Sequence, residues 1–118
     1  MNTQIIPKKS NDLFVEGKIK EYKYLYHSRN KNVRELCLKN SNGICYVCGF
    51  NFGKVYGEIG EGFLEVHHIN PIWSFIGEHK ITLDELYAVC SNCHSMIHRQ
   101  KKPLNVEELK RIISERKI

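Results

Sequence analysis

The sequence has no long hydrophobic run. Nowhere in its 118 residues does a stretch of about 18 apolar residues occur, which is the length that a membrane-spanning helix needs. The first ten residues, MNTQIIPKKS, also lack the apolar segment of a secretory signal. Membrane insertion and export are therefore not expected, and the sequence predicts a cytoplasmic protein.

Internal repeats, low-complexity tracts and a second domain are also missing. With 118 residues, 42% of them hydrophobic, the chain can build one small globular domain whose modest core would gain from a cross-link. Disulfides are not expected, because a reducing compartment keeps thiols reduced. The five cysteines are therefore interpreted as metal ligands plus one spare.

Acidic residues are few at both ends of the chain. Residues 1–40 carry nine Lys and Arg against four Asp and Glu, residues 99–118 carry seven against three, and residues 41–98 carry two against six. This pattern fits a centre that holds cations and flanks that meet a polyanion. Solubility is the more common reason for lysine-rich ends, and charge alone does not separate the two.

The pattern of apolar and turn residues predicts an α+β fold built from short elements. A helix is expected over residues 30–40, with Cys37 on its buried face and Gly43 just beyond its end. Cys37 has no partner at metal-binding spacing and is assigned to the core. Strands are expected over 63–69 and 86–90, with a glycine-rich loop before the first strand.

Two helices are expected after the second strand. Residues 91–102 are predicted as a short helix with a basic end. Residues 104–118 are predicted as an amphipathic helix in which Asn105 and Glu108 have capping-box spacing. No element is assigned to the N-terminal basic segment, residues 1–28, as a whole; residues 16–30, EGKIKEYKYLYHSRN, fit either an irregular strand or an extended basic arm.

Four of the five cysteines form two Cys-x-x-Cys pairs. Cys45 and Cys48 lie about forty residues before Cys90 and Cys93. Each pair can direct two sulfurs to a zinc ion about 2.3 Å away, and two pairs complete a tetrahedral site. Independent redox motifs are the alternative, but two such pairs in so short a chain favour one shared metal. A closed four-sulfur site serves folding, not chemistry.

Four of the six histidines also fall in pairs. His67 and His68 are adjacent in the first predicted strand, and successive strand side chains leave by opposite faces, so we expect different roles for them. His94 and His98 are four residues apart in the helix that Cys93 anchors, a spacing that suits two ligands of one divalent cation. An isolated pair would more often be two surface histidines. Here, one member of the first pair can complete the cation site.

The cysteine pairs and the histidine pairs lie in two segments, CYVCGFNFGKVYGEIGEGFLEVHHINP and then LDELYAVCSNCHSMIHR. In that order they resemble the HNH endonuclease family, in its McrA-like form with an added four-cysteine zinc site. The resemblance covers residues 29–99 and continues into KKPLNVEELK, so residues 29–118 are predicted as the nuclease domain. It implies a ββα-metal finger, in which a β-hairpin and a helix enclose a catalytic cation, and it implies hydrolysis of DNA.

The resemblance also implies roles for single residues. The implied ligands of the catalytic cation, Mg²⁺, Mn²⁺ or another divalent ion, are His67, His94 and, as a further ligand, His98. His68 is the implied general base, and an imidazole suits this task because its pKa lies near neutrality. Many relatives have an asparagine where this chain has Glu85. Glu85 is expected to tie the loop and orient the base, with Asp84 as the alternative.

Several basic residues flank this constellation and are expected to pair with phosphates of DNA. They are Arg29, Lys31, Arg34, Arg99, Lys101 and Lys102. Glu65 is expected on a solvated strand face, although it is also placed to accept a hydrogen bond from a ligand imidazole. His27 and His79 are expected at the surface, and Trp73 and Phe75 in the packing of the hairpin.

Two other functions fit the same residues. One is a non-catalytic zinc module that binds nucleic acid through its basic ends; an unliganded His68 beside a complete ligand set argues against it. The other is the catalytic part of a larger restriction system, with weak activity when its recognition partner is missing. One active site cuts one strand, so duplex cleavage implies a homodimer or two sequential cuts.

Overall fold

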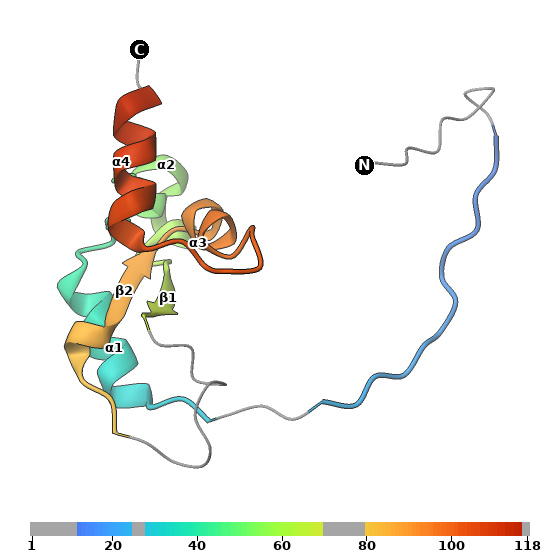
Figure 1. Ribbon diagram of the computed structural model, residues 1–118, viewed down its shortest axis with the longest axis horizontal. Helices are drawn as coiled ribbons and strands as arrows, with labels where there is room; N and C mark the ends of the chain where they lie inside the picture. The colour runs from blue at the N-terminus through green and yellow to red at the C-terminus, as the bar shows by residue number, and fades with distance from the viewer. Residues whose placement is uncertain (1–11, 25–27, 70–79, 117–118) are drawn as a thin grey trace.

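The computed structural model describes residues 12–24, 28–69 and 80–116. In this part of the chain, short helices surround a two-stranded antiparallel sheet (Figure 1). The elements, in chain order, are α1 (Lys31–Asn40), α2 (Phe52–Tyr56), the 3₁₀-helix η1 (Gly57–Gly60), β1 (Glu65–His68), the 3₁₀-helix η3 (Leu83–Glu85), β2 (Leu86–Val89), α3 (Ser91–Ile97) and α4 (Val106–Arg116). The predicted α+β class is confirmed. Among the described residues, no helix combines the length and apolarity that crossing a membrane requires.

The hairpin of β1 and β2 is the centre of the fold. In its register His67 lies opposite Tyr87 and His68 lies opposite Leu86. The Ile69 N–H donates to a backbone carbonyl just before β2 and continues the pairing by one step. Helix α1 contacts both strands and α3 contacts β1, and in Figure 1 the two helices flank the hairpin from different sides. The hairpin is thereby held between α1 and α3, the helix that follows Cys90.

The helix predicted over residues 30–40 is present as α1. Asn30 caps it, because its side-chain oxygen accepts the Val33 N–H at 3.0 Å. After the helix, Asn42 and Gly43 have positive φ angles of 55° and 76°, which turn the chain toward the first cysteine pair. Cys37 is buried on the inner face of α1 and belongs to the core, as expected.

The prediction of a loop before the first strand is wrong, because residues 52–60 form the helices α2 and η1. Asn51 caps α2 by accepting the Lys54 N–H at 3.2 Å, and the rings of Phe52 and Tyr56 stack one turn apart with centroids 5.9 Å apart. The glycines permit close packing here: a Cβ on Gly60 would lie 2.4 Å from the backbone oxygen of Phe52. Glycine content was therefore misleading as a loop signal.

The strands and the two C-terminal helices are shorter than predicted. Helix α3 ends at Ile97, whose carbonyl accepts the Leu104 N–H at 2.9 Å, so the chain turns back where the sequence predicted further helix. Helix α4 begins later than predicted, and Asn105 accepts the N–H of Glu107 at 2.8 Å. The sequence predicted a capping box between Asn105 and Glu108, whereas the hydrogen bond to Asn105 comes from Glu107.

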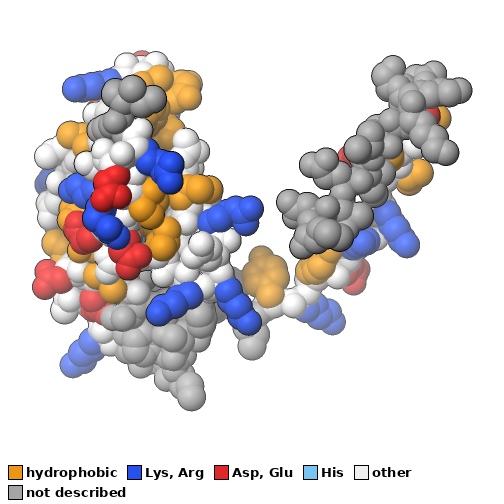
Figure 2. Space-filling model, turned by 45° about the horizontal axis from the view of Figure 1, so that its top comes forward, with side chains coloured by type: hydrophobic (Ala, Val, Ile, Leu, Met, Phe, Trp, Pro, Cys, Tyr) orange, Lys and Arg blue, Asp and Glu red, His pale blue; other side chains and the backbone are white. Residues whose placement is uncertain are grey.

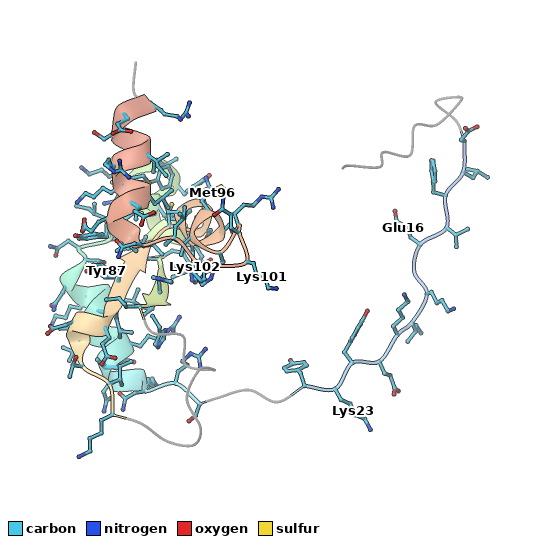
Figure 3. The ribbon with its side chains drawn as sticks, in the orientation of Figure 1. Glu16, Lys23, Tyr87, Met96, Lys101 and Lys102 are labelled. Carbon is cyan, nitrogen blue, oxygen red and sulfur yellow. The ribbon has the colours of Figure 1, made fainter. Side chains whose placement is uncertain are left out.

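The described part of the N-terminal segment, residues 12–24, is extended and contains no helix or strand. It runs away from the main body (Figure 1), and Glu16 and Lys23 point outward from it (Figure 3). Of the two predicted forms, the extended arm is the one observed. This part carries three lysines and three acidic residues, so it contributes no excess of basic charge. The predictions for His27, Trp73, Phe75 and His79 fall outside the described residues.

Candidate metal centres

Four cysteine sulfurs meet where the turn after α1 approaches the start of α3. The Sγ atoms of Cys45, Cys48, Cys90 and Cys93 all lie within 4.8 Å of one another, and those of Cys48 and Cys90 are 3.7 Å apart. A tetrahedral zinc ion with Zn–S bonds of about 2.3 Å sets its sulfurs about 3.8 Å apart. The cluster therefore fits the predicted zinc ion, and none of the five cysteines is in a disulfide.

Backbone N–H groups contact two of these sulfurs, those of Cys45 and Cys90. The Cys48 N–H points to Cys45 Sγ at 3.5 Å, and the Cys93 N–H points to Cys90 Sγ at 3.4 Å. Burial opposes ionisation of the Cys45 thiol, but backbone hydrogen bonds from Cys48, Cys90 and Val47 outweigh it and lower its pKa. Burial and the neighbouring sulfurs raise the pKa of Cys93. A bound dication reverses that effect, because it stabilises the thiolates that it ligates.

A second cluster consists of the three histidines His67, His94 and His98. One ring nitrogen of each lies within 4.8 Å of the others, and the ring centroids are 5.0 to 5.5 Å apart. Burial, with the charges of His98 and His94, lowers the pKa of His67 to about 4, and burial also lowers the pKa of His98. Neutral imidazoles keep the lone pairs that a cation needs. Of the adjacent pair, His67 is the member that joins this cluster.

Glu65 contacts this histidine cluster, although 40% of its side chain is exposed to solvent. Its Oε1 lies 2.8 Å from Nδ1 of His94, and its Oε2 accepts the Ser91 hydroxyl at 2.9 Å. The hydrogen bond with His94 has the larger effect and that with Ser91 the smaller, and together they lower the pKa of the Glu65 carboxyl group. Of the two expectations for Glu65, the hydrogen bond to a clustered imidazole is present on a side chain that stays partly exposed, because Glu65 and His67 alternate onto the same face of β1 and that face meets α3. The role of Ser91 was not predicted. Its position directly after Cys90 places it in the first turn of α3.

His68 leaves β1 by the other face and is partly buried. It lies opposite Leu86, the residue after Glu85. The Glu85 carboxylate accepts the backbone N–H of Thr82 at 2.8 Å and lies 3.3 Å from the Thr82 hydroxyl. Glu85 therefore caps the short η3 helix that precedes β2, while its tie to the rest of the loop and its effect on the orientation of His68 stay predictions. Asp84 is exposed.

The basic residues singled out in the sequence are all exposed. Lys101 and Lys102 lie in the turn between α3 and α4, and Lys101 points outward from it (Figure 3). Lys31 lies 4.0 Å from Glu35 in an exposed pair, which solvent weakens. Among the residues that the structure describes, Figure 2 shows Lys and Arg side chains gathered on the side of the body next to the arm, whereas basic and acidic side chains mix on the opposite side.

A surface cluster joins α4 to the first cysteine pair. The Tyr46 hydroxyl donates to the Glu107 carboxylate, and this bond raises the pKa of Tyr46 to about 12. The Lys110 ammonium lies 4.3 Å from the centre of the Tyr46 ring, and the Tyr87 ring packs against it at a tilt of 48°, with the ring centroids 4.6 Å apart. These contacts fix α4 against the turn that carries Cys45 and Cys48. The position of Tyr46 between these two cysteines did not predict this role.

Comparisons with known proteins agree with this geometry. The family model described as HNH endonuclease matches residues 45–100, a range that contains both metal clusters and His68. The chain contains an HNH endonuclease domain.

The chain is also similar to a curated protein of Escherichia coli (strain K12), the Type IV methyl-directed restriction enzyme EcoKMcrA. The two are 38% identical over 81 residues, which cover 69% of this chain and 27% of the relative. The McrA-like resemblance is therefore confirmed. The chain spans about a quarter of the length of the relative that it matches.

Proposed function

We propose that this chain is a metal-dependent endonuclease that hydrolyses phosphodiester bonds of DNA, with residues 29–118 as the nuclease domain. The observation that carries the proposal is the meeting of His67, His94 and His98 beside the separate imidazole of His68, within an HNH domain. A module that only binds nucleic acid has no use for an imidazole next to a three-nitrogen cation site. The cytoplasmic location stays a prediction from the sequence.

Each histidine has its own part in this proposal. His67, His94 and His98 hold one divalent cation, Mg²⁺, Mn²⁺ or another, through neutral ring nitrogens that already lie within 4.8 Å of one another. When bound, the cation supplies stabilisation for the charge that develops on the phosphate and on the leaving oxygen. His68, on the opposite face of β1, accepts a proton from the attacking water. Glu85 holds the loop that leads into β2 beside this base.

The four cysteines have no part in the reaction. Their four sulfurs lie within 4.8 Å of one another and would fill all four positions of a bound zinc, so none would be open for water or substrate. The zinc instead joins the turn after α1 to the start of α3, the helix that carries His94. We therefore propose that the structural zinc positions the catalytic histidines.

The test of this function is cleavage of a supercoiled plasmid by the purified chain with Mg²⁺, Mn²⁺ or Ni²⁺, and with EDTA as the control. We expect nicked circles that appear only with a divalent cation, because one site cuts one strand. DNA binding without cleavage under every metal would favour the zinc-stabilised binding module. Linear product at the earliest times would indicate two sites acting together, as in a homodimer.

A second candidate is the catalytic part of a larger restriction system. It is favoured by the relative, which is named as methyl-directed and is much longer than this chain. The same assay on methylated and unmethylated plasmids distinguishes a self-sufficient endonuclease from the catalytic part of a larger system. Equal, weak cleavage of both DNAs would place recognition outside this chain, whereas preference for methylated DNA would place it within.

We also propose that Arg99, Lys101 and Lys102 pair with DNA phosphates on one side of the site, and Arg29, Lys31 and Arg34 on the other. Replacing both Lys101 and Lys102 with Gln is expected to reduce the slope of log affinity against log salt concentration by about 2, since each phosphate contact contributes about 0.9. Cleavage at saturating DNA should change little. The measurement is fluorescence anisotropy of labelled DNA between low and physiological salt.

The matched control for this prediction replaces Lys39 and Lys54 with Gln. Both are exposed lysines, on α1 and α2, so net charge changes by the same amount. An equal flattening of the slope in the control would show that net charge, not contact by Lys101 and Lys102, drives binding. Wild-type affinity that does not depend on salt would remove nucleic acid as the partner.

A further inference from the structure

Residues of α3 hold the Glu65 carboxylate at both of its oxygens. Oε1 lies 2.8 Å from Nδ1 of His94, and Oε2 accepts the Ser91 hydroxyl at 2.9 Å. Glu65 comes from β1 and the other two residues from the first turns of α3. The carboxylate therefore bridges the hairpin and the helix beside the histidine cluster.

This contact determines which nitrogen of His94 can bind a cation. An ionised carboxylate has no proton to donate, so Nδ1 of His94 must donate to Oε1. The proton then sits on Nδ1, and the lone pair remains on Nε2. His67 alternates onto the same face of β1 as Glu65, so the carboxylate and the ligand nitrogens are oriented by one strand and one helix.

We propose that Glu65 is a positioning residue for the cation site, that it fixes His94 as the Nδ1-protonated tautomer, and that Ser91 holds Glu65 in place. The inference rests on the proposed function, because it concerns the cation that the three histidines would hold. Glu65 acts through His94 and also adds a negative charge next to the cation. Outer carboxylates of this kind raise the basicity of a ligand imidazole and restrict its rotation.

The first test is calorimetric titration of DNA-free protein that retains one zinc per chain, with Ni²⁺ as the probe. Glu65→Ala is expected to weaken Ni²⁺ binding 10- to 100-fold, the usual effect of removing such a partner. Glu65→Gln should have a smaller effect, because its amide oxygen can still accept from Nδ1, and Ser91→Ala should weaken binding only a few-fold. Glu58→Gln, which removes an exposed carboxylate on η1, should bind like wild type.

The second test is ¹⁵N NMR of the His94 ring in the same proteins without Ni²⁺. Wild type and Glu65→Gln should show a protonated Nδ1, and Glu65→Ala should show a mixture of tautomers. A purely structural role for Glu65 would change thermal stability without changing the tautomer. If Glu65→Ala does not fold, Ser91→Ala and Glu65→Gln still provide both readouts.

The results separate this inference from the function on which it rests. Ni²⁺ binding that is absent in wild type, or unchanged in His67→Ala, would overturn the cation site and the inference with it. Tight wild-type binding that Glu65→Ala leaves unchanged, with an unchanged His94 tautomer, would overturn the role of Glu65 alone. Weaker binding together with a mixed tautomer would establish it.

Discussion

The His68→Ala variant is expected to cleave plasmid DNA on the order of a hundredfold or more slowly than wild type, the usual scale for losing a positioned base. Its fold, zinc content and DNA affinity should be nearly unchanged. His68 lies on the face of β1 opposite to His67 and is not among the three clustered histidines, so its loss leaves the cation ligands in place. The measurement is the single-turnover cleavage rate at saturating DNA.

The matched variant is His67→Ala, which removes the buried member of the cation cluster. We expect its activity to fall as well, but to recover partly when Mg²⁺ or Mn²⁺ is raised, because the variant has lost cation affinity and not the base. Added metal should not restore His68→Ala. Equal recovery of both variants would show that the two roles are assigned wrongly. Full activity in His68→Ala would remove the proposed mechanism and favour the binding module.

Purified protein is expected to contain about one tightly held zinc per chain, and Cys45→Ser or Cys90→Ser is expected to be unfolded or insoluble. A structural zinc contributes roughly 10–16 kcal/mol at pH 7, whereas the whole unfolding free energy of a small domain is about 5–15 kcal/mol. Cys45, Cys90 and Cys93 are also buried in the core, together with Val89 and Ile97. Loss of the metal would therefore remove most of the stability.

The measurements for this prediction are metal analysis by mass spectrometry and thermal unfolding followed by circular dichroism, with and without a chelator. Cys37→Ser is the control, because Cys37 is a buried cysteine outside the four-sulfur cluster. It should lose some stability but keep its zinc. A soluble, zinc-free wild-type protein with a cooperative melt would contradict the role assigned to the four cysteines.

Local sequence signals located several elements correctly. The apolar pattern within residues 30–40 and the glycine at position 43 predicted α1, and the apolar segments 63–69 and 86–90 predicted the hairpin of β1 and β2. Helix α2 was missed, because the close approach of Gly60 to Phe52 is a packing contact that a count of glycines does not contain. The end of α3 was also misplaced, since a hydrogen bond from Leu104, seven residues beyond, ends it.

The sequence by itself determined the chemistry of the cysteine cluster and the histidine cluster. Each Cys-x-x-Cys pair brings its sulfurs together within one turn, and His94 and His98 are one helical turn apart, so short-range geometry is enough. Only the tertiary structure decided that His67 joins the histidine cluster and that Glu65 bonds to His94. Alternation along a strand separates adjacent side chains onto two faces, but which face meets α3 depends on how the hairpin packs against that helix. That packing is long-range, and no local pattern in β1 records it.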